Sequence, residues 1–508
     1  MPCTTILVGK NASYDGSTII ARNEDEGSGK FNPQRMQVVL PQDQPVKYRS
    51  VGSHAVVDLS GLTPQRYTSV PDALGTDGIW AASGVNECDV AMTATETISV
   101  NERVLGADPL VELRPAQGTP GEEGYVAEVP GGLGEEDFVT LVLPYIRTAR
   151  EGVLRMGELL ERYGTYETNG MAFSDLDEIW WLETIGGHHW IARRVPDDCY
   201  VAMPNQLGID RFDLADAEGT GREHLCSADL RAWMVAHHLD LTFRAPGEAA
   251  DVFNPREAFG TASDADHIYN TPRAWSMQRY LSPGRGMWDG PDATYTPESD
   301  DIPWCQQPHR LVTIEDVKYA LSLHYQGTPY DCYGSQGDEA TRGAYRPIGI
   351  NRNNQLAVLQ LRPYAPAGCR AVQWMAFGSN TFNALAALYA NVRTIPDYLS
   401  NTSARVTTDN IYWANRLVAV MADAHFNTCA PYIEDYQHTV GALGHALLTA
   451  TDQTVAESCA SRDDACAMLE GANERMACDL RRETDKLLDK VLFTASLGMR
   501  NAFARSDG

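Results

Sequence analysis

A cysteine is the third residue of the chain, at the start of an apolar and β-branched run that ends at Gly9. If Met1 and Pro2 were removed, Cys3 would carry a free α-amine. Such an amine has a pKa of about 7.7–8.0 and can take the proton of the neighbouring thiol. One residue would then supply both the nucleophile and its base, which is a recognised way to activate a weak nucleophile. Cys3 is therefore the candidate nucleophile, provided that Met1-Pro2 is removed.

Two charged residues farther along could prepare this thiol. Arg22 falls on a predicted strand that returns beside Cys3, and a guanidinium near the sulfur would lower the pKa of the thiol. Asp25 could hold and orient the ammonium group. Position alone favours a simpler interpretation, in which Cys3 is a buried strand residue. Arg22 and Asp25 would then form an ion pair on the surface.

Other catalytic motifs are missing from the sequence. It has no G-x-S-x-G turn for a serine nucleophile and no H-E-x-x-H motif for zinc. The pairs His188-His189 and His237-His238 are adjacent residues, which point to opposite faces of a strand and are poorly placed to share a metal ion. We expect the first pair to be structural. The 11 cysteines include no C-x-x-C pair. The sequence therefore predicts no metal and no organic cofactor.

The composition narrows the range of partners. The 508 residues include 68 acidic and 41 basic side chains, which gives a formal net charge of −27. This balance opposes binding to nucleic acid and to anionic membranes. No apolar stretch approaches the roughly 20 residues of a membrane span, and no signal peptide is recognisable at the start. We therefore expect a cytoplasmic protein that binds neither nucleic acid nor membrane.

The predicted elements place Cys3 in a β-hairpin. The alternation over residues 3–9, the Asp15-Gly16 turn and the run over 18–22 are typical of two paired strands. Other strands are predicted over residues 78–82, 90–94, 178–194 and 198–203. An exposed loop is predicted over 108–134, helical patterning over 135–163, and helices after about residue 400. Because strands and helices do not alternate regularly, the pattern favours an α+β fold.

The residues around Cys3 also carry a family resemblance. Cys3-Thr4-Thr5, Asp15-Gly16 and Arg22-Asn23-Glu24-Asp25 resemble the opening of the penicillin acylase and bile-salt hydrolase superfamily. The chain is still more similar to the bacterial dipeptidase A family, over nearly its whole length. The segments that carry this resemblance are CTTILVGK (3–10), AMTATET (91–97), GLGEEDFVT (132–140), LETIGGHHWIARR (182–194) and RPIGINR (346–352). Residues 110–130 resemble an enlarged family loop, and the last hundred residues match less tightly.

The resemblance implies a fold and an activity. It implies a four-layer αββα N-terminal-nucleophile hydrolase domain over residues 1–400, with residues 1–2 removed on maturation, and a helical C-terminal extension over 401–508. It also implies a cysteine dipeptidase that hydrolyses dipeptides by acyl transfer through Cys3. We expect a homo-oligomer. Two alternatives stay open: an amide hydrolase of the same fold that acts on N-acyl amides, and a non-enzymatic scaffold that resembles the secernins.

The resemblance also implies roles for residues far from Cys3. Asn86, in Gly84-Val85-Asn86-Glu87, would donate its amide to the oxyanion, although the Cys88-Asp89 that follows departs from the family pattern. Asn205, in Met203-Pro204-Asn205, would lie beside the nucleophile, and Arg273 would be the distal arginine. Each asparagine could instead use its side chain locally in a turn. Glu96 could pair with the amino end of a dipeptide or belong to a structural network.

Overall fold

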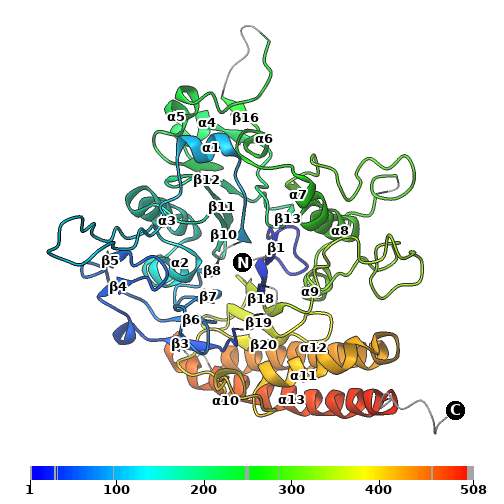
Figure 1. The fold of residues 1–508 in the computed structure, drawn as a ribbon. Helices are drawn as coiled ribbons and strands as arrows, with labels where there is room; N and C mark the ends of the chain where they lie inside the picture. The colour runs from blue at the N-terminus through cyan, green and yellow to red at the C-terminus, as the bar shows by residue number, and fades with distance from the viewer. Residues whose placement is uncertain are drawn as a thin grey trace.

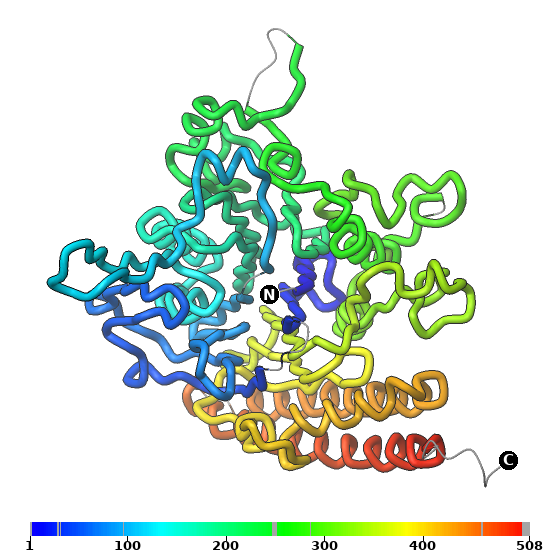
Figure 2. Tube along the Cα trace, viewed as in Figure 1, coloured from blue at the N-terminus to red at the C-terminus, as the bar shows by residue number. Residues whose placement is uncertain are grey.

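The structure is a computed structural model that describes residues 3–27, 30, 32–94, 96–245, 251–284, 286–458 and 461–499. Met1 and Pro2, whose removal the sequence predicts, lie outside the described residues. Within these residues the fold is a mixture of helices and antiparallel sheets, which confirms the α+β class, and the two largest sheets have seven strands each (Figure 1). The first strand lies in the middle of the molecule, and the rest of the chain surrounds it (Figure 2).

The first sheet holds Cys3. Its strands, in spatial order, are β17 (Cys305–Gln306), β13 (Tyr200–Met203), β1 (Cys3–Val8), β2 (Thr18–Asp25), β18 (Asn353–Leu361), β19 (Ala371–Phe377) and β20 (Ala386–Tyr389). The predicted hairpin is confirmed as β1 and β2, and Gly16 in its turn has a φ of 81°, a conformation that glycine adopts without strain. In this register Cys3 lies opposite Glu24 and Thr5 lies opposite Arg22.

The second sheet is built mainly from the middle of the chain. Its strands are β15 (His224–Cys226), β12 (His189–Arg194), β11 (Ile179–Ile185), β10 (Asn169–Ser174), β8 (Ala91–Thr93) and β7 (Ser83–Val85), and β9 (Glu96–Thr97) also pairs with β10. The predicted strand over residues 78–82 is wrong, because β7 begins only at Ser83. Gly78 and Trp80 have φ values of 119° and 49°, which are not those of an extended strand.

The two sheets pack face to face. Leu7 and Ile20 of the first sheet share one buried apolar cluster with Trp181 and Ile191 of the second. Ile6 of β1 belongs instead to the cluster on the opposite face. Because side chains alternate along a strand, the odd-numbered residues of β1 and the even-numbered residues of β2 point toward the second sheet.

Helices cover the outer faces of both sheets. α2 (Glu135–Val142) and α3 (Ala149–Tyr163) pack on the second sheet, and the predicted helical region is interrupted between them at Pro144, which cannot supply a backbone N–H. α8 (Thr271–Leu281) and α9 (Ile314–Ala320) pack on the first sheet. The remaining helices of this part are α1 (Glu102–Ala107), α4 (Leu214–Glu218), α5 (Leu230–Ala236), α6 (Pro255–Phe259) and α7 (Asp264–Tyr269).

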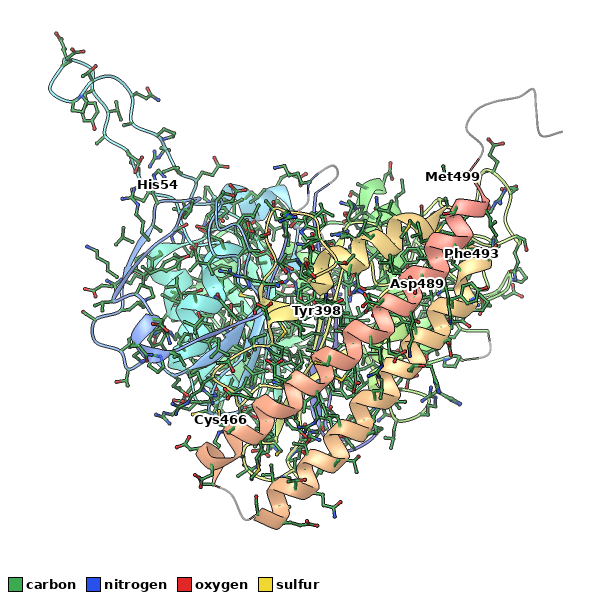
Figure 3. All side chains as sticks on the ribbon, turned by 90° about the horizontal axis from the view of Figure 1, so that it is seen from below. His54, Tyr398, Cys466, Asp489, Phe493 and Met499 are labelled. Carbon is green, nitrogen blue, oxygen red and sulfur yellow. The ribbon has the colours of Figure 1, made fainter. Side chains whose placement is uncertain are left out.

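The C-terminal part is helical. After α10 (Asp397–Ser400) come α11 (Ile411–Asp423), α12 (Phe426–Ser458) and α13 (Arg462–Leu497). α12 and α13 run side by side along the molecule (Figure 3). Leu448 and Leu469 share a buried cluster with Trp374 of β19, and Asn473 Oδ1 accepts a 2.8 Å hydrogen bond from the backbone N–H of Tyr389. These helices therefore complete the core beside the edge of the first sheet.

Shorter elements lie around this body. They are the strands β3 (Gln37–Val39), β4 (Lys47–Arg49), β5 (Val56–Asp58), β6 (Tyr67–Ser69), β14 (Phe212–Asp213) and β16 (Val252–Phe253). The predicted loop is exposed from residue 114 to residue 130, and it stands away from the body beyond His54 (Figure 3). Within the described residues, no helix has the length and apolar character needed to cross a membrane.

Candidate active site

The thiol of Cys3 lies between the two sheets, in direct contact with Arg22. Cys3 is the first residue of β1 and is completely buried. The alternation of β1 and β2 turns Cys3, Thr5, Arg22 and Glu24 to the same face. Arg22 Nη2 donates a hydrogen bond of 2.8 Å to Cys3 Sγ. The expected contact between guanidinium and sulfur is therefore present.

Carboxylates hold the Arg22 guanidinium in place. Nη2 also contacts Oε1 of Glu135 at 2.5 Å, and Nη1 contacts Oε2 of Glu24 at 3.3 Å. Nη1 donates as well to the carbonyl oxygen of Ala82, at 3.3 Å. All of these groups are buried. The guanidinium therefore has little freedom to turn away from the sulfur, since its contacts come from β2, from Ala82 just before β7 and from the first turn of α2.

The electric environment of the thiol combines opposing effects. Burial raises the pKa of the Cys3 thiol well above its ordinary value, the charge of Arg22 lowers this pKa, and Glu135 and Glu96 raise it further. Burial by itself would lower the pKa of Arg22, but the adjacent Cys3 and Glu135 keep that pKa above its usual value. Arg22 therefore stays charged, while Cys3 needs a nearby base to lose its proton.

The backbone of Cys3 is held by Asn205 and Arg273. The N–H of Cys3 donates to Asn205 Oδ1 at 3.1 Å, and Asn205 Nδ2 donates to the carbonyl oxygen of Thr97 at 2.8 Å. Arg273, buried in the first turn of α8, donates to Asn205 Oδ1 at 2.7 Å and to the carbonyl oxygen of Cys3. Its Nη1 also donates to Thr4 Oγ1 at 2.7 Å. The structure therefore brings both residues to the main chain of Cys3.

Asp25 lies on the other face of β2. Its carboxylate accepts hydrogen bonds from Arg346 Nη2 and Asn353 Nδ2, and it is completely buried. The interpretation of Arg22 and Asp25 as a surface ion pair is wrong, because both residues are buried and each pairs with other groups. The two side chains alternate to opposite faces, which keeps them apart.

Glu96 is a buried carboxylate that is coupled electrostatically to Cys3. Its Oε2 accepts a hydrogen bond of 2.6 Å from Thr5 Oγ1, and Thr5 lies on the same face of β1 as Cys3. Its Oε1 is buried and has no hydrogen-bond partner among the described residues. Burial raises the pKa of Glu96 to about 7, against the opposing effects of Arg273 and of the Thr5 hydrogen bond. An acceptor of this kind suits a ligand that carries N–H groups.

Comparisons with known proteins identify the family. The chain is similar to a dipeptidase of Bifidobacterium longum (strain NCC 2705), with 55% identity over 543 residues that span 100% of both proteins. It is similar to a probable dipeptidase A of Streptococcus pyogenes serotype M3 (strain SSI-1), with 52% identity over 508 residues and 100% of each. It is 44% identical to the dipeptidase A of Lactobacillus helveticus over 492 residues, 96% of each. Peptidase family C69 matches residues 2–439. The chain belongs to peptidase family C69.

In this C69 peptidase, no described hydrogen bond joins Asn86 to Cys3, and the Asn86 side chain bonds to backbone groups elsewhere. Its Nδ2 donates to the carbonyl oxygens of Leu143 and Ile146, at 2.9 and 2.8 Å. Its Oδ1 accepts from the backbone N–H groups of Cys88 and Val90, at 2.9 and 3.2 Å. These bonds use the side chain to hold the turn between β7 and β8. The oxyanion role of Asn86 therefore stays a prediction, one in which its amide would have to leave the carbonyl oxygens of Leu143 and Ile146.

Sequence reasoning missed Glu24, Glu135 and Arg346 as members of the site of the C69 chain. Glu135 lies in the acidic first turn of α2, which is favourable at the start of any helix, so the sequence carries no separate signal of its contact with Arg22. Glu24 stood inside the Arg22–Asp25 motif without a role of its own. Arg346 lies in the segment over residues 346–352 that resembles the family. That resemblance was the one signal in the sequence that could have indicated a role for Arg346 near the site.

The histidine pair has a structural arrangement. His188 and His189 both contact the carboxylate of Asp108 through Nδ1, at 3.1 and 2.7 Å. Burial alone would raise the pKa of Asp108, but the hydrogen bonds from the two histidines hold it at about 2. Both side chains reach one carboxylate because His188 lies in the turn before β12. His189 also stacks on Trp233, with ring centroids 4.0 Å apart.

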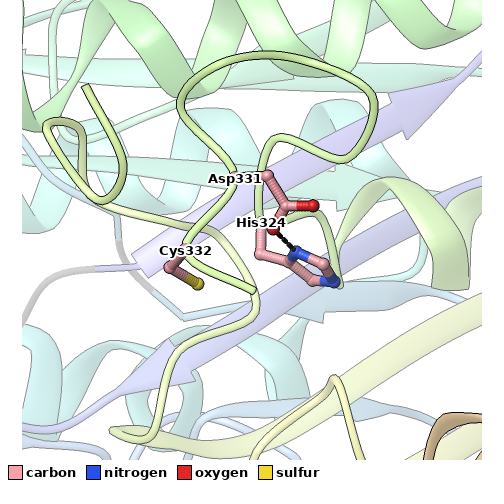
Figure 4. A group of neighbouring side chains, drawn as sticks. All are labelled: His324, Asp331 and Cys332. Atoms are coloured by element: carbon pink, nitrogen blue, oxygen red, sulfur yellow. Dashed lines mark hydrogen bonds and ion pairs between the residues drawn. The ribbon is translucent and has the colours of Figure 1, made fainter. Parts of the chain in front are cut away.

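One group of described side chains in this C69 peptidase has the residue types and spacing to hold a metal ion. His324, Asp331 and Cys332 place donor atoms within 4.8 Å of one another (Figure 4). Asp331 Oδ1 is already hydrogen-bonded to His324 Nδ1 at 2.7 Å. No described hydrogen bond or ion pair joins any of the three to Cys3 or Arg22. The group therefore adds nothing to the site around Cys3.

Proposed function

We propose that this C69 peptidase is a dipeptidase that hydrolyses its substrates by acyl transfer to Cys3, on the four-layer αββα fold of N-terminal-nucleophile hydrolases. The observation that carries the proposal is the 2.8 Å hydrogen bond from Arg22 Nη2 to Cys3 Sγ at the head of β1. Relatives that match along their full length are named dipeptidases, at 55% and 52% identity. The face-to-face packing of two sheets with helices outside supports the fold.

The mechanism begins with removal of Met1-Pro2. While Pro2 is attached, the nitrogen of Cys3 is an amide and cannot act as a base at neutral pH. Once released, the amine takes the thiol proton, and the sulfur attacks the carbonyl carbon of the dipeptide. The amine then returns the proton to the leaving amino acid. Water hydrolyses the thioester and releases the second amino acid.

The residues around Cys3 have separate tasks in this mechanism. Arg22 stabilises the thiolate by its charge and its hydrogen bond. Asn205 Oδ1, which accepts from the Cys3 nitrogen at 3.1 Å, holds the amine after maturation. Arg273 fixes Asn205 and the Cys3 carbonyl, so that the amine and the sulfur keep one geometry.

Glu96 gives a reason for a preference for dipeptides. The amino group of a dipeptide is charged at neutral pH, whereas an N-acyl amide has no charge at that position. The buried Oε1 of Glu96, which lacks a described hydrogen-bond partner, can accept from this ammonium group. A buried ion pair of this kind rejects a substrate that leaves the carboxylate unpaired.

The test combines N-terminal sequencing, intact mass and a panel of dipeptides. Active protein should begin at Cys3, Cys3→Ala should abolish hydrolysis, and Cys226→Ala should keep most of it. If cleavage is autocatalytic, Cys3→Ala protein should retain Pro2. Full activity in protein that still carries Met1-Pro2 would exclude the amine as the base. Full turnover by Cys3→Ala would end the assignment of the nucleophile.

A further inference from the structure

A cavity of about 800 Å³ lies apart from Cys3, between α9, the chain segment that follows it, and α12. None of the residues that line it contacts Cys3 or Arg22. Cavities of roughly 300–1,000 Å³ are the usual size of small-molecule sites. The proposed mechanism makes no use of this one.

The lining of the cavity includes the buried amine of Lys318. Lys318 of α9 is 9% exposed, and its Nζ donates to Ser322 Oγ at 2.8 Å and to the carbonyl oxygen of Asn380. Both acceptors are neutral, and no described carboxylate lies within ion-pair distance of Nζ. Burial lowers the pKa of Lys318 to about 7. An ammonium group has three hydrogens, so one remains for a ligand, and an anion there would offset the cost of burying the charge.

Aromatic and acidic side chains also line the cavity. Tyr333 and Phe426 are stacked with their ring centroids 3.9 Å apart, and Trp374 forms another wall. Asp331, also in the wall, is hydrogen-bonded to His324 (Figure 4). Glu434 of α12 lines the cavity where α12 is exposed to solvent. The lining thus combines one amine, several aromatic rings and an exposed carboxylate.

We propose that this cavity binds a free α-amino acid, with its carboxylate on Lys318, its side chain against the aromatic walls and its ammonium group toward Glu434. The choice of an α-amino acid rests in part on the proposed function, since hydrolysis of a dipeptide releases amino acids. A simple fatty acid has no cationic group to pair with Glu434.

The cavity is also linked to the strand that carries Arg22. Asn380, whose carbonyl oxygen accepts from Lys318, donates through Nδ2 to Asn23 Oδ1 at 2.7 Å. Asn23 lies between Arg22 and Glu24 in β2. A carboxylate on the remaining hydrogen of Lys318 is therefore joined through Asn380 to the residue beside Arg22. An amino acid released by dipeptide hydrolysis would therefore bind at a position that is hydrogen-bonded, through Asn380, to β2.

The test is calorimetric titration of the Cys3→Ala protein with L-phenylalanine, which suits the aromatic walls. Lys318→Met keeps the length of the side chain and removes the amine, so it should weaken binding by roughly tenfold or more. Lys10→Met, a matched change at a partly exposed lysine, should leave binding unchanged. Phenylalaninamide lacks the carboxylate. Its binding to the parent protein should therefore be as weak as the binding of phenylalanine to Lys318→Met.

Three outcomes would overturn the proposal: no binding of phenylalanine, binding that survives Lys318→Met, or equal binding of the amide. Binding that survives would belong to the site around Cys3, which Lys318→Met leaves intact. A melting curve checks that Lys318→Met is folded, and the exposed Glu434→Gln, which should also weaken binding, provides a second variant. Dipeptide hydrolysis by the unsubstituted protein is measured separately. If hydrolysis is absent but binding depends on Lys318, the proposed function fails and the cavity site stands.

Discussion

At the scale of single residues, one guanidinium and three carboxylates surround the thiol of Cys3. Arg22 bonds to the sulfur at 2.8 Å and is itself held by Glu135 and Glu24. Burial opposes ionisation of the thiol, and Arg22 favours it. Glu96 keeps one oxygen without a described partner beside this group. We therefore expect a substitution of any of these side chains to change the reactivity of Cys3 or the binding of substrate more than it changes the fold.

Replacing Arg22 tests the preparation of the thiol. Arg22→Lys keeps a charge but loses the planar group that contacts sulfur, Glu135 and Glu24 together. We expect kcat to fall by about 10²–10³-fold, as when one preorganised donor is removed. The pH at which iodoacetamide alkylates Cys3 should shift upward, because the pKa of the thiol rises. Arg222→Lys, which changes an exposed arginine, is the control. An unchanged alkylation profile would return Arg22 to a structural role.

Replacing Glu96 tests recognition of the substrate's amino group. The carboxylate is ionised above its pKa of about 7 and protonated below it, so the ion pair with an ammonium group is lost as pH falls. Binding of a dipeptide to Cys3→Ala protein should therefore weaken from about pH 8 to about pH 6. Glu96→Gln should weaken binding by about 1.5–3 kcal/mol and remove this pH dependence.

An N-acetyl dipeptide is the control for the Glu96 prediction. It lacks the ammonium group, so Glu96→Gln should change its binding little. The exposed Glu122→Gln should behave like the parent protein with both ligands. If the pH dependence of dipeptide binding persists in Glu96→Gln, another group holds the amino end.

At the scale of elements, the alternation of β2 divides its polar residues between two tasks. Arg22 and Glu24 face the second sheet and the thiol, whereas Asp25 faces away and pairs with Arg346 and Asn353. β13 contributes in another way, because its pairing with β1 brings the following Asn205 to the Cys3 nitrogen. β2 thus places Arg22 and Glu24 beside the thiol on one face and the ion pair of Asp25 with Arg346 on the other.

Replacing Asp25 tests this division. Asp25→Ala would leave the Arg346 guanidinium buried without its carboxylate, a loss that costs about 3–5 kcal/mol when a buried pair is broken. We therefore expect a large decrease in the free energy of unfolding, measured by urea denaturation. Asp58→Ala, at an exposed position in β5, should have a small effect. A fully stable Asp25→Ala protein with strongly reduced kcat would instead place Asp25 at the amine.

At the scale of the whole molecule, the site depends on distant parts of the chain meeting between the sheets. Cys3, Glu96, Glu135, Asn205 and Arg273 come from two sheets, two helices and a loop. The C-terminal helices do not contribute to this group, but they share apolar clusters with the first sheet. Their contribution should therefore appear in stability.

Adjacent residues of α13 test that contribution. Leu469 is completely buried against the first sheet, so Leu469→Ala should lower the free energy of unfolding by about 2–5 kcal/mol. Met468 is 38% exposed, and Met468→Ala should change stability by about 0.5 kcal/mol or less. Both variants are measured by thermal and urea unfolding. If Leu469→Ala and Met468→Ala lowered stability equally, the packing of α13 as part of the core would be contradicted.

The sequence alone predicted those parts of the molecule that depend on neighbours along the chain. The hairpin of β1 and β2, its turn at Gly16 and the contact of Arg22 with Cys3 follow from alternation over residues 3–25. The helices after residue 400 follow from apolar spacing. The placement of Asn205 and Arg273 beside Cys3 came from motifs, since neither periodicity nor charge indicates it.

Only the tertiary structure decided which distant groups meet and which do not. Glu135 reads locally as a favourable helix start, and its pairing with Arg22 exists because the packing of α2 on the second sheet brings the first turn of α2 to Arg22. Asn86 reads as an oxyanion donor by motif, but its amide is used by the backbone around Leu143. The physical reason is that local patterns specify the face of a strand or helix. Which charged side chains that face meets depends on how the layers pack, and contacts over such separations leave no mark in the spacing of nearby residues.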